Sequence, residues 1–219
     1  VVSIASGAAL VITGAETIGG LTGAGALVLD ETLTVANGSG VYSGGAGGAG
    51  GLIVSGGSLT LGGTLTQSAG TTVSNGADVT LTGAASNNGT VVTVTGTGSS
   101  LIVGATGSIN ATGGAPAVVV ATADADVTNS GTIQSAGTGV RLTAGGALIN
   151  NAGGGITGGD YGVQSGGGLL VTNGGSISGL YDGLNILNGS ALTLTNTGSI
   201  TANLYGAIYS TGAITITNS

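Results

Sequence analysis

Short runs of alternating apolar and polar residues fill this chain, and clusters of Gly, Asn and Ser separate them. The run SLTL at 58–61 and the run DVTLT at 78–82 are examples. Such alternation predicts a strand with one buried face and one exposed face. Val, Ile and Thr favour strands, whereas Gly and the β-branched residues are poor helix formers. The pattern therefore predicts an all-β chain.

A phrase of this kind returns from about residue 120 onward. Its first marker is an apolar residue two places before an Asn, which recurs at intervals of 21, 23, 23 and 22 residues: Val127, Leu148, Val171, Leu194 and Ile216. Its second marker is a closing isoleucine, at Ile133, Ile156, Ile177 and Ile200. Its third is an aliphatic residue after Gly, at Val140, Val163, Leu184 and, one residue later, Ile208. Three markers that share one period and keep their order indicate a structural repeat.

A unit of about 22 residues with three short strands has the size of one coil of a single-stranded parallel β-helix, a β-solenoid. Each strand would pair with its equivalent in the next coil, and the inward residues would stack as aliphatic ladders. Because paired strands lie about 4.8 Å apart, roughly ten coils would form a rod on the order of 50 Å long.

The Asn of the repeated phrase is predicted to stack from coil to coil, at Asn129, Asn150, Asn173, Asn196 and Asn218. Gly and Asn both tolerate the left-handed backbone conformation that tight corners need. Stacked Asn side chains also hydrogen-bond along the stacking axis. A role as ordinary turn residues overlaps with this ladder, and both roles are structural.

Residues 1–219 are expected to form one solenoid domain. The coils of 116–219 are regular, whereas 1–115 show less regular coils with Gly-rich corner loops, including the stretch 44–51. The chain begins without Met and its last residues, ITITNS, fall within the repeat. We therefore expect it to be a segment of a longer polypeptide.

Two stretches, ETIGGLTGAGALVLDETLTV at 16–35 and YSGGAGGAGGLIVSGGSLTLGG at 42–63, resemble the autotransporter-associated repeats of Gram-negative type V secreted proteins. Their passengers carry I-G-x-L-x-G-x-G-x-L-x-L, then G-G-L-x-x-x-G-x-L-T-L, and elsewhere N-x-G-x-I. These phrases match Ile18 to Leu29, Gly50 to Leu61, and the stretch 129–200. The resemblance covers most of the chain, in motifs of low complexity.

The resemblance implies a right-handed β-helix displayed at the bacterial cell surface, beyond the outer membrane, in adhesion, aggregation or biofilm contact. Its partners would be a host or neighbouring cell surface, protein or glycan, or copies of the same chain. Membrane attachment is expected only through a part of the polypeptide outside these residues. Filamentous-haemagglutinin-like adhesins, which use two-partner secretion, share the solenoid and the composition, so both families stay open.

Composition argues against catalysis, cofactors and nucleic acid. The chain has no His, Cys or Met, and its only basic residue is Arg141, against eight acidic residues. Nucleic-acid binding draws on Lys and Arg, and nucleophilic or metal catalysis needs activating or ligating residues that are missing here. Gly45 to Gly50 match G-x-G-x-x-G by spacing, but a strand-like run follows instead of a helix. Asp124 and Asp126, like Asp30 and Glu31, are interpreted as solvated corners, so we expect no catalytic, cofactor or metal site.

Two outward-facing features suggest surface contacts. Tyr161, Tyr181 and Tyr205 each precede the Gly-aliphatic marker, so they are expected to stack at one corner, where they would bind a sugar or protein or only shield the corner. Thr pairs at Thr193/Thr195 and Thr215/Thr217 predict an outward Thr array, interrupted at Asn150. The main prediction is thus a non-enzymatic stalk. A self-assembling extracellular fibre or sheath is the alternative, and an ice-binding solenoid is the minor alternative.

Overall fold

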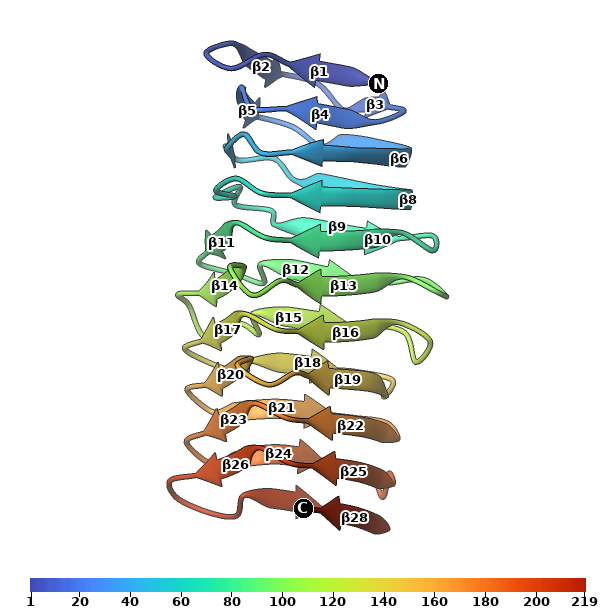
Figure 1. Cartoon of the computed structure of the whole chain (residues 1–219), viewed down its shortest axis with the longest axis vertical. Coiled ribbons are helices and arrows are strands. Elements are labelled where there is room, and N and C mark those ends of the chain that lie inside the picture. Colours follow the sequence, from blue (N-terminus) through green and yellow to red (C-terminus); the bar gives the residue numbers. More distant parts are fainter.

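The computed structural model describes all residues, 1–219, as an all-β parallel solenoid of about ten turns without any helix (Figure 1). The chain runs leftward along the front strands and rightward along the rear strands while it descends from the N-terminus (Figure 1). This path is right-handed, as the family resemblance implied. No helix long and apolar enough to cross a membrane is present.

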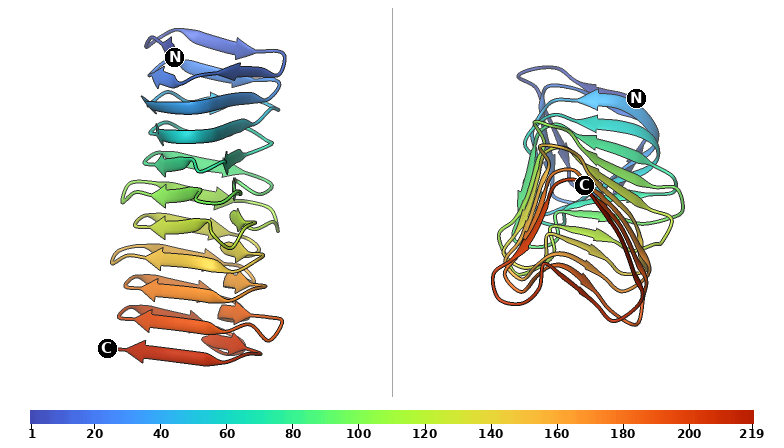
Figure 2. Two further views of the ribbon diagram at one scale, coloured as in Figure 1. Left: turned by 90° about the vertical axis from the view of Figure 1, so that its right-hand side faces the viewer. Right: turned by 60° about the horizontal axis from the view of Figure 1, so that its bottom comes forward.

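Three parallel ladders run the length of the rod and give each coil three sides (Figure 2). The first ladder contains β1 (Val2–Ile4), β4 (Leu21–Gly23), the second halves of β6 (Leu33–Tyr42) and β8 (Leu52–Leu61), β10 (Asp78–Leu81), β13 (Ser100–Val103), β16 (Asp126–Asn129), β19 (Gly146–Asn150), β22 (Leu169–Asn173), β25 (Leu192–Asn196) and β28 (Ile214–Asn218).

The second ladder contains β2 (Ala9–Ile12), β5 (Ala26–Leu29), β7 (Ala46–Gly47), β11 (Ala84–Asn87), β14 (Ser108–Ala111), β17 (Thr132–Ser135), β20 (Gly155–Gly158), β23 (Ser176–Gly179) and β26 (Ser199–Ala202). Leu65 bridges β7 to β11 through isolated pairings with Ala46 and Ala85.

The third ladder contains β3 (Glu16–Ile18), the first halves of β6 and β8, β9 (Thr71–Ser74), β12 (Val92–Val94), β15 (Val118–Val120), β18 (Val140–Leu142), β21 (Tyr161–Ser165), β24 (Asp182–Ile186) and β27 (Ile208–Ser210). Within one coil the chain therefore passes from the first ladder to the second, then to the third, and returns to the first.

Stacked aliphatic columns form the core, and the markers of the sequence repeat lie within them. On the second ladder, Ile109, Ile133, Ile156 and Ile177 are fully buried and in register, and Ile200 continues the column. The Gly-aliphatic marker forms a second column on the third ladder. Each column presents an aliphatic side chain to its neighbours above and below, so the core has no layer that depends on distant parts of the chain.

Coil length changes along the rod while the register stays continuous. The pairings of Gly23 with Tyr42 and of Tyr42 with Leu61 give coils of 19 residues near the N-terminus. Near the C-terminus, 21 to 23 residues separate stacked asparagines. The Gly-rich stretch 44–51 contains β7, whose Ala46 pairs with Leu27, so this stretch is part of a short coil. The extra residues of the longer coils lie in the corners.

Tyr42 is a fully buried aromatic residue in the N-terminal half of the core. It stacks on Gly23, and the nearby Gly44 leaves room for the ring, because a Cβ atom at Gly44 would lie 2.8 Å from both Cζ and the hydroxyl oxygen of Tyr42. The Tyr42 hydroxyl lies 2.8 Å from the carbonyl oxygens of both Gly25 and Gly45 and donates its single proton to one of them at a time. Burial raises the pKa of Tyr42 to about 12.

Stability is therefore predicted to fall in alkaline solution. Tyr42 has a raised pKa in the folded chain and the ordinary value of 10.0 in the unfolded chain. Between pH 10 and about 12 the unfolded chain binds fewer protons, so the free energy of unfolding decreases as pH rises. Urea unfolding over this range should show that slope, and Tyr42→Phe should make it shallower. An unchanged slope in Tyr42→Phe would contradict the assignment to Tyr42.

Removal of one whole coil is predicted to leave a folded, shorter rod. Val140 and Val163 are register partners, so deletion of residues 140–162 joins Gly139 to Val163 and preserves every column. Small-angle X-ray scattering should show a rod about 4.8 Å shorter, with the β-sheet circular dichroism retained. Deletion of 140–150 is the control, because it removes β18 and β19 without closing a coil and should unfold the region around the cut.

Candidate functional site

The five predicted asparagines form one continuous side-chain ladder at the corner between the first and second ladders. Each side-chain Nδ2 donates to Oδ1 of the next Asn, at 2.8, 2.8, 2.7 and 2.7 Å from Asn129 through Asn218. Asn129, Asn150 and Asn173 are fully or almost fully buried. Because every amide points the same way, each buried donor faces an acceptor and each buried acceptor faces a donor.

The Asn ladder occupies a column that is apolar in the N-terminal half. Leu61, Leu81 and Val103 lie in register above Asn129. The amides also serve the backbone at this corner, since Asn150 Nδ2 lies 3.2 Å from the carbonyl oxygens of Gly154 and Ser176. Asn therefore satisfies carbonyl groups that an aliphatic side chain at the same place would leave to other donors.

Tyr161, Tyr181 and Tyr205 also come together, at the corner between the second and third ladders. The ring centroids of Tyr161 and Tyr181 are 5.7 Å apart with a tilt of 49°. Those of Tyr181 and Tyr205 are 5.5 Å apart and nearly parallel, at 20°. The rings thus form a stack along the rod axis.

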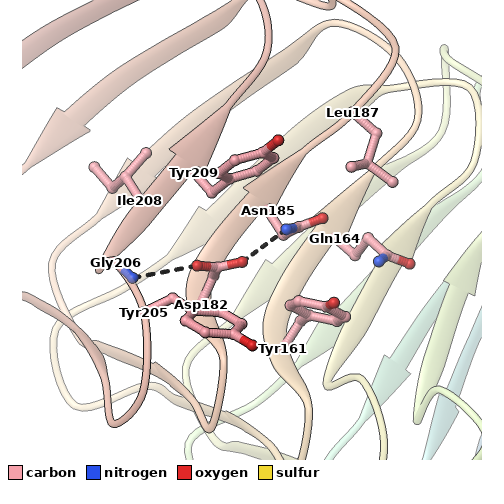
Figure 3. Close-up of a pocket in the computed structure, with 9 residues that line it drawn as sticks. All are labelled: Tyr161, Gln164, Asp182, Asn185, Leu187, Tyr205, Gly206, Ile208 and Tyr209. Carbon is pink, nitrogen blue, oxygen red and sulfur yellow. Dashed lines mark hydrogen bonds between the residues drawn. The ribbon is translucent and has the colours of Figure 1, made fainter.

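Beside this stack, the outer surface of the third ladder has a hollow of about 550 Å³ (Figure 3). Its lining residues come from three consecutive coils and are Tyr161, Gln164, Asp182, Asn185, Leu187, Tyr205, Gly206, Ile208 and Tyr209. Most of them form two rows along the axis: Tyr205, Asp182 and Tyr161 in one row, and Tyr209, Asn185 and Gln164 in the other (Figure 3).

Asp182 and Asn185 form the polar centre of the hollow. They are only 3% and 5% exposed. Asn185 Nδ2 donates to Asp182 Oδ2 at 2.7 Å, and the backbone N–H of Gly206 donates to Asp182 Oδ1 at 3.3 Å. Asn185 Oδ1 is buried and has no hydrogen-bond partner. An unpartnered buried acceptor costs about 1–3 kcal/mol, so the site favours a group that donates a hydrogen bond to it.

The surroundings also change the acidity of Tyr161. Burial raises its pKa, and the negative charges of Asp182 and Asp160 raise it further. The negative charge of Asp182 thus affects the Tyr161 side chain that lines the hollow.

The sequence pattern indicated the tyrosine stack but missed the centre of the hollow. Asp182, Asn185, Gln164 and Tyr209 were not singled out, although a signal for them exists. Outward residues spaced three apart recur on consecutive coils, as Tyr161 with Gln164 and Asp182 with Asn185. A search for one residue type that recurs every 22 residues misses these positions, because the residue type changes from one coil to the next.

The other acidic residues do not gather into a site. Asp124, Asp126, Asp30 and Glu31 are exposed. No group of three or more His, Cys, Asp or Glu residues that would hold a metal ion occurs in the structure. The residues that match G-x-G-x-x-G form β7 and its flanking corners, and no helix follows them.

The outward Thr residues of the first ladder form an interrupted column. Thr128, Thr172, Thr195 and Thr217 are in register, but Ile149 lies between Thr128 and Thr172. The residue that interrupts the array is therefore Ile149, because Asn150 points inward.

In comparisons with known proteins, no protein-family model, no curated protein and no solved structure matches the chain.

The Asn ladder predicts a large loss of stability for Asn150→Asp. The new carboxylate has no donor to offer Asn173 Oδ1, and a flip of the Asn173 amide would only move the mismatch to Asn196. We expect the free energy of unfolding to drop by about 3 kcal/mol or more. Asn110→Asp is the matched control, since Asn110 is exposed on β14, and it should change stability by less than about 0.5 kcal/mol. Equal effects of the two variants in urea unfolding would contradict the ladder.

Proposed function

We propose that this chain is a non-catalytic stretch of an extracellular β-helical rod. The rod is displayed at the surface of a Gram-negative cell by type V secretion and contacts other surfaces in adhesion, aggregation or biofilm growth. Its role is mechanical and adhesive: it projects from the cell and presents side chains along its length.

The observation that carries this proposal is the unbroken stack of about ten coils. Every coil pairs with the next on three sides, and the same apolar columns continue through the whole segment. Such a structure is stiff along its axis, and length is gained by adding coils without redesigning the core. The Gly- and Leu-rich phrases at 16–35 and 42–63, which resemble autotransporter-associated repeats, support the secretion route.

The non-catalytic part of the proposal follows from the available side chains. A hydroxyl nucleophile needs a base beside it, and this chain contains no His, Cys or Lys. Its hollow holds one carboxylate, whereas glycoside hydrolysis needs a pair of them across a cleft. These features favour a role in binding other surfaces over a role in catalysis.

The outward-facing residues of the first ladder support ice binding less well than they support a contact surface. Ile102, Ile149 and Leu170 are exposed among the Thr and Ser positions of the first ladder, so its outer surface is not a regular Thr array. The hollow and the tyrosine stack, by contrast, are local features of the kind that a contact surface provides.

Surface display predicts that an epitope tag in an exposed corner is reached by antibody on intact cells. The corner at Asn151–Gly153 is exposed, so a tag inserted after Gly153 in the full-length protein should leave the ladders intact. Immunogold electron microscopy should show label on thin rods that project from unpermeabilised cells. Label that appears only after permeabilisation would contradict display. Continuous filaments detached from cells would instead favour the self-assembling fibre.

A further inference from the structure

We propose that the hollow on the outer surface of the third ladder binds a single cationic group, the ammonium of a lysine or the guanidinium of an arginine on a partner protein. The inference rests on the proposed contact function and gives that contact its chemistry. Four features of the hollow support it: its shape, its charge, its unpartnered acceptor and its aromatic lining.

The hollow has the form of a shallow cage built across three coils. β21 contributes Tyr161 and Gln164, β24 contributes Asp182 and Asn185, and the last coil contributes Tyr205 and Tyr209 (Figure 3). Tyrosines thus lie on both sides of the carboxylate along the rod axis. A volume of about 550 Å³ admits the end of a long side chain together with its water, and the site opens laterally, away from the core.

Its charge is negative and has no cationic partner within the chain. Asp182 is 97% buried, and the groups that donate hydrogen bonds to its carboxylate, the Asn185 amide and the Gly206 N–H, are both neutral. The only basic residue, Arg141, lies one coil beyond Gln164 and donates from Nε to Gln164 Oε1 at 3.1 Å. A buried carboxylate without a counter-ion attracts a cation and repels an anion.

The buried polar atom at the base of the hollow that lacks a hydrogen-bond partner is an acceptor. Asn185 Oδ1 has no partner, and the amide that holds it is fixed by the bond from Asn185 Nδ2 to Asp182. Ammonium and guanidinium groups are donors only, so they match this floor, whereas a carboxylate or phosphate offers it nothing.

The aromatic lining adds a second attraction for the same group. Tyr161, Tyr205 and Tyr209 line the hollow, and tyrosine rings attract cations through the negative potential of their faces. A neutral sugar would also pack against tyrosine. It would not, however, gain from the charge of Asp182, so ionic strength separates the two ligands.

The test uses the five tyrosines as built-in probes. With ¹³C-labelled tyrosine rings, the purified chain is titrated with Nα-acetyl-arginine methylamide and Nα-acetyl-lysine methylamide. Ring signals of Tyr161, Tyr205 and Tyr209 should shift with a dissociation constant on the order of 1 mM, while those of buried Tyr42 should stay unchanged. Side-chain protons of the probe next to the charge should move upfield, because they lie over ring faces.

Two variants and their control connect the binding to the proposed groups. Asp182→Asn keeps the shape, removes the charge and should weaken binding at least tenfold. Tyr209→Ala changes an outward, half-exposed side chain and should weaken it several-fold. Asp160→Asn is the control, because this carboxylate lies near Tyr161 but does not line the hollow, and its effect should stay below about twofold. Because Tyr42 reports only on the distant N-terminal coils, the ring signal of Tyr181 is the local control: Tyr181 belongs to the adjacent stack but does not line the hollow, and an unchanged signal shows that the fold around the site persists.

Three results would overturn the inference: binding that Asp182→Asn leaves intact, binding of methyl glucoside or acetate in place of the cations, or no shift of the three tyrosines at all. None of these results bears on cell-surface display, which the epitope experiment measures separately. Loss of display with intact cation binding would contradict the proposed function and leave the chemistry of the hollow standing.

Discussion

In-register pairing between successive coils is the constraint on which the rest of this structure depends. Because each residue lies directly above and below its equivalents, about 4.8 Å away, every side chain must be compatible with a copy or a substitute of itself. Aliphatic residues meet this condition by packing, and Asn meets it by offering a donor on one side and an acceptor on the other. Charges do not meet it, since like charges at that distance repel. The constraint explains a composition with only 4% charged residues, and it explains why Ser100 separates Asp78 from Asp126 in their column.

The same constraint marks where function is to be sought. Positions that repeat, such as the isoleucine column of the second ladder, build the rod and say little about its purpose. The hollow arises where the repeat is broken: Asp182 pairs with Tyr161, and Asn185 stands between Gln164 and Tyr209. Unlike side chains in one column leave a depression and an unpartnered amide oxygen that identical side chains would not produce. A lateral site of this kind sits on a rigid base, because β21 and β24 are paired with a strand on each side and β27 is paired with β24.

Much of the fold was predictable from sequence, because stacked coils of similar length make the same residue types recur at the coil length. The all-β class, the coil of about 22 residues and the roughly ten turns followed from the spacing of Val127, Leu148 and their equivalents, and the structure confirms them. The grouping of the five asparagines and of Tyr161, Tyr181 and Tyr205 followed in the same way. The 19-residue coils near Tyr42 were harder to see, since Gly replaces the aliphatic marker in part of the columns. Asp182 and Asn185 were not predicted, because neither residue type recurs at the same position in the neighbouring coils. Their burial also depends on the tyrosines of those coils.

Disulfide formation between engineered cysteines distinguishes the stacked register from any other pairing, and the chain has no native Cys that would compete. Asn110 and Gln134 are outward register partners on β14 and β17, whereas Thr132 pairs with Ser108. Asn110→Cys combined with Gln134→Cys should form an intramolecular disulfide rapidly and without loss of stability. Asn110→Cys with Thr132→Cys, two residues out of register on the same face, should oxidise slowly or only on unfolding. Equal rates for the two pairs, or a preference for the second pair, would contradict the stacked register and every column derived from it.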